Sequence, residues 1–239
     1  MDVTSLHSRH IVVTGVSRGI GRALTDCLAG RGAKLTVCAR DQESMTILDA
    51  HPNILGRALS INQRAAVQSW IADGVAASGP IDVLINNVGM LGPMMPMDDY
   101  PPDQWQQVLE TNLMGTFHVV QAALPHVVRP GGIMLHVSSY LGRHGLENYG
   151  AYCVSKFGIE GMAQILAEEH RHEGIISCAI DPGMVQTEML RAAMGTDDVS
   201  EHHTPEQAAD AFIHILQDLT LEDSGRPINL WNESPASAE

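Results

Sequence analysis

Short apolar segments alternate with longer amphipathic segments along this chain of 239 residues. The short segments are rich in β-branched and aliphatic residues, as is typical of strands covered on both faces. They predict strands at residues 10–15, 34–39, 54–61, 81–85, 133–138 and 175–180, with an edge strand at 227–231. Helical spacing predicts helices at 22–30, 63–77, from 102 towards Pro125, around Tyr152 up to about Arg171, and at 206–219.

This alternation of strand and helix predicts the fold class. We expect an α/β fold with a doubly wound sheet of about seven mostly parallel strands and helices on both faces. A chain of this length in this class commonly forms one domain. The sequence therefore predicts a single domain over residues 1–231 and a disordered tail over 232–239.

The first predicted strand ends in a glycine-rich turn that leads into the first helix, with glycines at Gly15, Gly19 and Gly21. Such a turn lets backbone amides and the positive helix N-terminus approach an anionic pyrophosphate. The spacing differs from the commoner G-x-G-x-x-G pattern. The strand before the turn and the helix after it nevertheless indicate a dinucleotide site.

Two arginines indicate which dinucleotide is bound. Arg40 follows the second predicted strand, where an acidic residue would bind a ribose 2′-hydroxyl and an arginine would accommodate a 2′-phosphate. Arg18 in the glycine turn supplies a second cation from the other side. The competing interpretation is that Arg40 pairs with Asp41 on a solvated loop. The phosphate interpretation predicts NADP(H).

Polar residues follow several predicted strands at the edge where such sheets bind ligands. They are Asn86 and Asn87 after the fourth strand and Ser138 and Ser139 after the fifth. Asn112 lies on the apolar side of the helix that begins near residue 102. Its amide either satisfies backbone groups or holds a catalytic water.

Tyr152 and Lys156 lie one turn apart on a predicted helix, so both side chains share one face. A nearby cation favours the phenolate and lowers the pKa of a tyrosine, which makes it a usable proton donor near neutral pH. A surface tyrosine beside a solvated lysine is the plain alternative, and only the neighbouring motifs decide between them.

Bulk properties exclude several classes of protein. The formal net charge of -14 argues against nucleic-acid binding, which depends on Lys and Arg contacts to phosphates. The N-terminus lacks the features of a signal peptide, and no apolar run reaches the length of a membrane span, so we expect a cytoplasmic protein with no membrane association. The four cysteines and twelve histidines show no metal-binding spacing, so no metal is expected.

Together these motifs resemble those of the short-chain dehydrogenase/reductase family in its compact, Rossmann-like form. The resemblance runs from His10 to Trp231 and rests on motifs in the family's order and spacing. They are Thr14-Gly15-x-x-x-Gly19-x-Gly21, Asn86-Asn87-x-Gly89, Asn112, Ser139 with Tyr152-x-x-x-Lys156, and Pro182-Gly183.

The resemblance implies a catalytic tetrad of Asn112, Ser139, Tyr152 and Lys156. In the implied mechanism, Tyr152 donates a proton to the substrate oxygen as the nicotinamide delivers hydride, and Ser139 holds the same oxygen. Lys156 lowers the pKa of Tyr152 and binds the nicotinamide ribose, while Asn112 anchors a water that relays protons. The family's spacing selects Ser139 over Ser138 and Tyr152 over Tyr149.

The resemblance also implies the cofactor contacts. Ser17, Arg18 and Ile20 are expected at the pyrophosphate, Asn87 at the adenosine side, and Val185 and Thr187 at the carboxamide. Two positions depart from the family pattern: Ser60-Ile61 stands where Asp-Val often binds adenine, and Val88 narrows the space over the ribose. The full predicted set is Gly15, Ser17, Arg18, Gly19, Ile20, Gly21, Arg40, Ser60, Ile61, Asn87, Val88, Gly89, Tyr152, Lys156, Pro182, Gly183, Val185 and Thr187.

The implied activity is NADPH-dependent reduction of a ketone or aldehyde to an alcohol, the carbonyl reductase type. An NAD(P)-dependent alcohol dehydrogenase working oxidatively and a non-catalytic dinucleotide sensor are the alternatives. Segments 91–97, 141–146 and 187–199 are rich in Met and Leu, which predicts an apolar, adaptable substrate pocket with His144 as a candidate contact. The resemblance implies a homotetramer or homodimer formed through the Trp105 and Tyr152 helices.

Overall fold

The computed structural model describes residues 6–49 and 51–231, so the predicted tail at 232–239 lies outside the described residues. Seven strands form one sheet in the order β3-β2-β1-β4-β5-β6-β7, and all six pairings are parallel. This confirms the predicted Rossmann-like α/β fold. The strands are β1 (His10–Thr14), β2 (Lys34–Ala39), β3 (Ile54–Ala58), β4 (Val83–Asn86), β5 (Ile133–Val137), β6 (Ile176–Asp181) and β7 (Ile228–Asn229).

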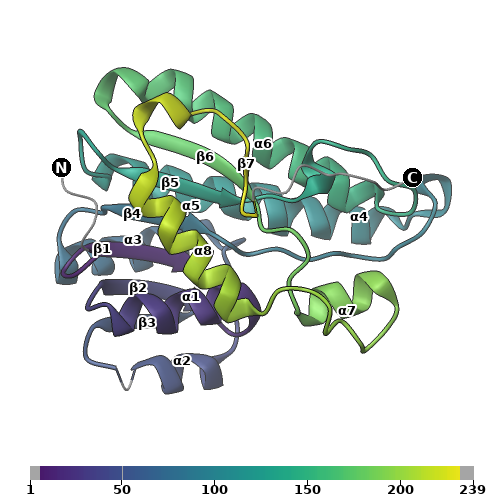
Figure 1. Cartoon of the computed structure of the whole chain (residues 1–239), viewed down its shortest axis with the longest axis horizontal. Helices are drawn as coiled ribbons and strands as arrows, with labels where there is room; N and C mark the ends of the chain where they lie inside the picture. Colours follow the sequence, from purple (N-terminus) through teal and green to yellow (C-terminus); the bar gives the residue numbers. More distant parts are fainter. Residues whose placement is uncertain (1–5, 50, 232–239) are drawn as a thin grey trace.

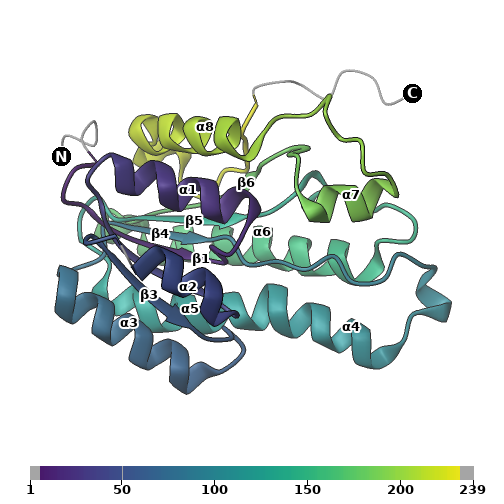
Figure 2. The ribbon, with the colours of Figure 1, turned by 90° about the horizontal axis from the view of Figure 1, so that it is seen from below.

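Helices cover both faces of the sheet (Figures 1 and 2). Successive residues of a strand point to opposite faces, and the strands therefore feed two separate cores. Ile11 and Val13 pack in one core with α1 and α8, whereas Val12 packs in the other with α3, α5 and α6. The helices are α1 (Gly19–Gly30), α2 (Gln42–Asp49), α3 (Arg64–Ser78), α4 (Pro102–Leu109), α5 (Gly115–Ala123), α6 (Gly150–His170), α7 (Glu188–Met194) and α8 (Pro205–Asp218).

The helix predicted from residue 102 is interrupted. α4 ends at Leu109, one π-helical turn spans Glu110–Met114, and α5 then continues to Ala123. The turn holds Asn112, which is 1% exposed. π-turns insert one extra residue into a helix and often occur at functional sites. Apolar periodicity alone could not locate this insertion.

The other differences are small. The sequence did not predict α2, and β3 ends at Ala58, so Ser60 and Ile61 lie in the turn after that strand. The short helix α7 spans Glu188–Met194, within one of the segments expected to line the substrate pocket. Thr204 caps α8 in a capping box with Gln207. Among the described residues, no helix has both the length and the apolar character that a membrane span requires.

Candidate active site

The candidate site is assembled at the carboxyl edge of the parallel sheet, because every strand ends there. β1 leads into the glycine turn, β4 into Asn87, β5 into Ser139 and β6 into the Pro182-Gly183 turn. Open parallel sheets bind their ligands outside this edge. Motifs that lie far apart in the sequence therefore reach one region of the molecule.

The glycine turn leaves space that a side chain would fill. Gly15 and Gly19 have φ angles of 75° and 58°, a conformation that favours glycine. A Cβ at Gly21 would lie 2.2 Å from the Gly15 carbonyl oxygen and 2.4 Å from Nδ2 of Asn87. Close packing of the turn on β1 and β4 thus requires glycine at this position.

The N-terminus of α1 is suited to an anion. Arg18 is its N-cap residue, no side chain caps the helix, and its first turn has no acidic residue. The first amides and the positive end of the helix dipole therefore lack a neutralising partner from the helix itself. These observations fit the pyrophosphate of a dinucleotide, with Ser17 and Ile20 half-buried beside the turn.

Asn87 holds this turn in place. Its Nδ2 donates to the carbonyl oxygens of Thr14 and Gly15, both at 3.0 Å, and its backbone amide donates to Oγ1 of Thr14 at 3.0 Å. The backbone amide of Val88 donates to the same hydroxyl at 3.3 Å. The expected contact of Asn87 with adenosine stays a prediction, whereas its contact with the glycine turn is a finding.

The two arginines expected at the phosphate differ in their surroundings. Arg40 is exposed, and no hydrogen bond or ion pair holds its guanidinium among residues 6–49 and 51–231. The Asp41 carboxylate instead accepts the amide of Ser44 at 2.7 Å. Arg18 forms an ion pair with Glu188 at the start of α7, and both side chains are exposed. The position expected to contact adenine lies in the turn after β3. Ser60 is half-buried there, and Ile61 is buried.

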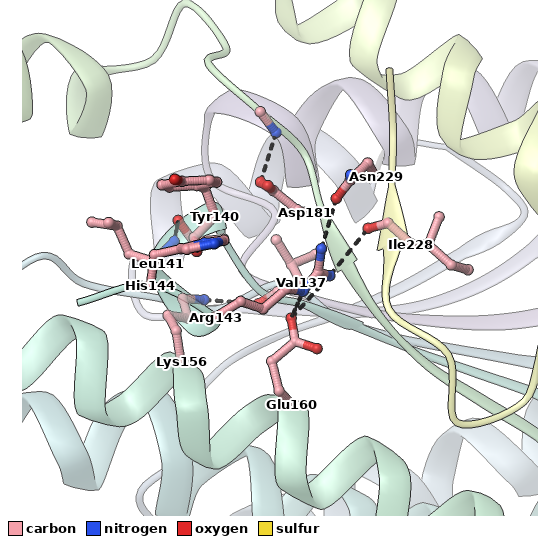
Figure 3. Close-up of polar contacts among 12 residues, drawn as sticks. Val137, Tyr140, Leu141, Arg143, His144, Lys156, Glu160, Asp181, Ile228 and Asn229 are labelled. Atoms are coloured by element: carbon pink, nitrogen blue, oxygen red, sulfur yellow. Dashed lines mark hydrogen bonds and ion pairs between the residues drawn. The ribbon is translucent and has the colours of Figure 1, made fainter. Parts of the chain in front are cut away.

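Lys156 is a buried cation, with 3% of the residue exposed. Its Nζ donates to the carbonyl oxygen of Val137, the last residue of β5, at 2.7 Å (Figure 3). Burial lowers the pKa of Lys156 to about 8, while the charges of Asp181 and Glu160 raise it. The ammonium therefore titrates much closer to neutral pH than an exposed lysine.

Tyr152 lies one turn before Lys156 on α6 and is 8% exposed. Burial raises the pKa of Tyr152 to about 12, while a hydrogen bond with Ser139 lowers it and Asp181 raises it further. The net shift is upward, opposite to the lowering that was expected from Lys156. Loss of hydration of the phenolate dominates, and Nζ of Lys156 lies 5.6 Å from the centroid of the phenol ring.

The structure distinguishes the candidate serines and tyrosines. Ser139 reaches Tyr152, and its Oγ also accepts the Leu141 amide at 3.2 Å. Ser138 is buried, and its Oγ has no hydrogen-bond partner among the described residues. The hydroxyl of Tyr149 donates to the carbonyl oxygen of Ala193 on α7 at 3.0 Å and is therefore engaged outside the Ser139 contact.

Asn112 joins the loop after β4 to α6. Its Oδ1 accepts the amide of Met90 at 2.8 Å, and its Nδ2 donates to the Met90 carbonyl and to Oγ of Ser155, both at 2.9 Å. A Cβ at Gly89 would lie 3.6 Å from Nζ of Lys156 and 4.0 Å from Oδ1 of Asn112. Both groups therefore flank Gly89, and the backbone role of Asn112 is a finding. The water relay stays a prediction.

The turn after β6 is fixed by Asp181 and Trp231. The amide of Gly183 donates to the Asp181 carboxylate at 2.9 Å, and Nε1 of Trp231 donates to the Pro182 carbonyl at 2.7 Å. Val185 is buried. Thr187 caps α7, and its Cγ2 lies 3.1 Å from where a Cβ of Gly19 would be. Thr187 thus lies against the glycine turn.

Sequence reasoning missed three charged residues around Lys156. Asp181 raises the pKa of both Tyr152 and Lys156, and Glu160 raises that of Lys156. Arg143 forms an ion pair with Glu160. An acidic residue directly before Pro182 at a strand end was a usable signal for Asp181. Among residues 6–49 and 51–231, no group of three or more His, Cys, Asp or Glu side chains could hold a metal ion.

Comparisons with known proteins agree with this arrangement. Residues 9–197 match the family model described as short chain dehydrogenase. The chain is 33% identical to the oxidoreductase YciK of Escherichia coli over 92% of this chain and 90% of YciK. It is 31% identical to the NADPH-dependent pterin aldehyde reductase of Arabidopsis thaliana, over 91% of each chain. A short chain dehydrogenase of Escherichia coli CFT073 complexed with NADPH superposes with a TM-score of 0.86 at 29% identity, covering 97% of this chain and all of that one.

The glycine turn yields a direct prediction about cofactor binding. A Gly21→Ala substitution is expected to raise the Kd for NADPH at least about tenfold, because a displaced turn costs more than ~1.4 kcal/mol of binding energy. NADPH fluorescence titration measures this change. Gly30→Ala, at the other end of α1, is the matched control, since a Cβ there meets nothing within 4 Å. Wild-type affinity in Gly21→Ala would contradict this account of the turn.

Proposed function

Because the chain belongs to the short-chain dehydrogenase/reductase family and is therefore an oxidoreductase, we propose that it reduces a ketone or aldehyde to an alcohol with NADPH. The observation that carries this proposal is the placement of Tyr152, a buried phenol that is hydrogen-bonded to Ser139 and lies with its ring centroid 5.6 Å from the buried Nζ of Lys156. At neutral pH this phenol keeps its proton. A proton donor needs that state, whereas oxidation of an alcohol needs the phenolate as a base.

The residues at the edge of the sheet fit the parts of a dinucleotide. The glycine turn and the free N-terminus of α1 would hold the pyrophosphate, and the segment from Val185 to Thr187 would hold the carboxamide. Lys156 would bind the nicotinamide ribose. When bound, NADPH supplies the hydride for the reduction. The chain's own residues then bind and orient the substrate and move the proton.

In this proposal Tyr152 and Ser139 act on the same substrate oxygen. Ser139 donates a hydrogen bond to the carbonyl oxygen, which orients it and stabilises the negative charge that develops there. Tyr152 then transfers its proton to that oxygen. Lys156 stabilises the phenolate left behind, because its ammonium is buried with Tyr152 in a region of low dielectric. Asn112 holds Met90 against Ser155 of α6, and a water bound at Asn112 would return the proton.

Arg40 and Arg18 support a preference for NADPH over NADH. Position 40 holds an arginine and not the acidic residue that would repel a 2′-phosphate. Its guanidinium is exposed and forms no hydrogen bond or ion pair within the described residues. Arg18 must exchange its exposed ion pair with Glu188 for a phosphate contact, and exposed pairs of this kind contribute little stability. The similar reductase from Arabidopsis thaliana is NADPH-dependent, and the similar dehydrogenase from Escherichia coli CFT073 was solved in complex with NADPH.

The substrate is proposed to have an apolar body. Each of the three segments expected to line the pocket, or the chain next to it, carries exposed apolar side chains, namely Met94, Met97, Leu146, Met184 and Met194. Methionine side chains adapt to different shapes and suit a pocket that accepts several carbonyl compounds. Tyr140 and His144 stack at 4.0 Å between ring centroids beside Ser139 and form a flat aromatic surface there.

We also propose that the protein forms a homodimer or homotetramer. Large apolar side chains are exposed along the helical segment from the π-turn through α5 and along α6: Met114, Phe117, Val154, Phe157 and Ile165. Their exposed fractions range from 41% to 59%, which is unusual for large apolar residues grouped on neighbouring helices. A second copy presenting the same face would bury them symmetrically.

Replacement of Tyr152 by Phe tests the proton donor. We expect the Tyr152→Phe variant to lose at least about 100-fold in kcat/KM for carbonyl reduction, since general acid catalysis contributes about 10²–10⁴. NADPH absorbance is followed with a panel of ketones and aldehydes at pH 7. Tyr149→Phe is the matched control, because that hydroxyl contacts Ala193 instead. Near-equal rates for wild type and Tyr152→Phe would rule out this role, and absence of turnover by wild type would reject the reductase proposal.

Replacement of Arg40 by Ala tests the cofactor preference. Loss of one charge-assisted contact is expected to lower kcat/KM for NADPH about 10- to 100-fold and to leave the value for NADH nearly unchanged. The control is Arg226→Ala, another exposed arginine that lies far along the sequence beside β7. Equal losses with both cofactors would mean that Arg40 does not recognise the 2′-phosphate.

The apolar face on α5 and α6 predicts how assembly can be broken. We expect Phe157→Glu to sediment as a smaller species than wild type in sedimentation velocity at micromolar concentration, because it buries a charge in the interface. Leu221→Glu places the same charge on an exposed leucine outside this face and serves as the control. A monomeric wild type, or unchanged assembly in Phe157→Glu, would refute the proposed interface.

A further inference from the structure

An ion pair one helical turn from Lys156 has no role in the proposed mechanism. Glu160 lies one turn after Lys156 on α6, and its side chain is 8% exposed. Nε of Arg143 donates to Oε1 of Glu160 at 3.1 Å, and a second guanidinium nitrogen lies 3.0 Å from the same oxygen. A buried carboxylate is costly unless it is paired, so this contact calls for an explanation.

Arg143 connects three elements at this point. Besides Glu160 on α6, it donates to Oδ1 of Asn229 at 2.7 Å and to the Ile228 carbonyl at 3.4 Å, both on β7 (Figure 3). Arg143 itself lies in the segment that follows Ser139. The guanidinium therefore ties the segment that carries Ser139 both to the helix that carries Tyr152 and to the edge of the sheet.

The segment after Ser139 packs closely on α6. A Cβ at Gly142 would lie 2.5 Å from Oγ of Ser138, 3.1 Å from Cγ of Glu160 and 3.1 Å from the Lys156 carbonyl oxygen. Only glycine allows this approach without movement. Gly142 is where the segment touches α6, and Arg143, the next residue, forms the ion pair with Glu160 on that helix.

The charges around Lys156 come from two elements. Tyr152 and Glu160 face it from α6, and Asp181 faces it from β6. Arg143 is paired with Glu160, so its positive charge partly cancels the negative charge that Glu160 presents to Lys156. Asp181 and Glu160 both favour the ammonium form, which opposes the cost of burial. The net charge on the pair Arg143 and Glu160 therefore influences whether Lys156 is protonated.

We propose that Arg143 and Glu160 are positioning residues of this active site: they hold the Ser139 segment on α6, and the Glu160 carboxylate places a negative charge one helical turn from the Lys156 ammonium. The proposal rests on the proposed function. The proposal predicts opposite effects of Arg143 and Glu160 on the pKa of Lys156. Loss of Glu160 leaves an unpaired cation near the ammonium, whereas loss of Arg143 leaves an unpaired carboxylate.

The composition of the chain allows a direct measurement. Lys34 and Lys156 are the two lysines of the sequence, so ¹³C-lysine labelling gives two Cε signals in NMR spectra. Lys34 is exposed at the start of β2 and provides the internal reference. The pH titration of the Lys156 signal is recorded for wild type, Glu160→Gln and Arg143→Met. Glu160→Gln keeps the shape of the side chain and an acceptor oxygen for Arg143.

The expected signs are opposite for the two variants. Glu160→Gln should lower the pKa of Lys156 by about half a pH unit, since a favourable charge is lost and Arg143 becomes uncompensated. Arg143→Met should leave this pKa unchanged or raise it. Glu173→Gln, which removes an ion pair with Arg129, is the matched control and should leave the Lys156 titration unchanged. If the pKa of Lys156 in Glu160→Gln lies within about 0.2 of the wild-type value, the proposed electrostatic effect of Glu160 is wrong.

Kinetics test the positioning half. In Glu160→Gln the alkaline limb of the kcat/KM profile should move to lower pH together with the NMR titration. In Arg143→Met, kcat/KM at pH 7 should fall about tenfold without such a shift, because Ser139 is less well oriented. Wild-type kcat/KM in Arg143→Met would overturn this half. The NMR titration needs no turnover, so a failed reductase assay in wild type rejects the proposed function separately.

Discussion

A buried ammonium is the constraint on which the candidate site depends. Lys156 lies inside the protein and is held by the carbonyl oxygen of Val137. That carbonyl is available because β5 ends there, at the edge where the parallel strands stop. Glycine at position 142 lets the segment after β5 approach α6 closely, because a Cβ there would lie 3.1 Å from the Lys156 carbonyl oxygen and 2.5 Å from Oγ of Ser138. The fold therefore provides both the space and the acceptor that this cation needs.

The same burial has opposite effects on the two groups that share the helix face. The pKa of Tyr152 rises to about 12 and that of Lys156 falls to about 8, because both charged forms lose hydration. Tyr152 is a neutral phenol beside an ammonium with a lowered pKa. It is suited to give up its proton when negative charge develops on a bound oxygen. This state agrees with carbonyl reduction at neutral pH, and Asp181 and Glu160 keep the ammonium charged.

Much of this could be predicted from the sequence, because the relevant signals are local. Apolar runs located the strands, the glycines located the dinucleotide turn, and the spacing of Tyr152 and Lys156 placed both on one helical face. The missed features depend on packing between distant segments. The π-turn at Asn112 forms where the side chain meets Met90 and Ser155. The pKa of Tyr152 depends on its burial, and the pairing of Arg18 with Glu188 depends on the position of α7.

The central claim is that hydride from NADPH and a proton from Tyr152 reach the same carbonyl group. Transfer of deuterium from NADPH labelled at the reactive C4 position tests it most directly, with the alcohol analysed by mass spectrometry. The account predicts one deuterium at the carbinol carbon for each NADPH consumed by wild type, and almost no labelled alcohol from Tyr152→Phe with NADPH still bound. NADPH consumption without labelled alcohol, or equal labelling by Tyr152→Phe, would contradict it.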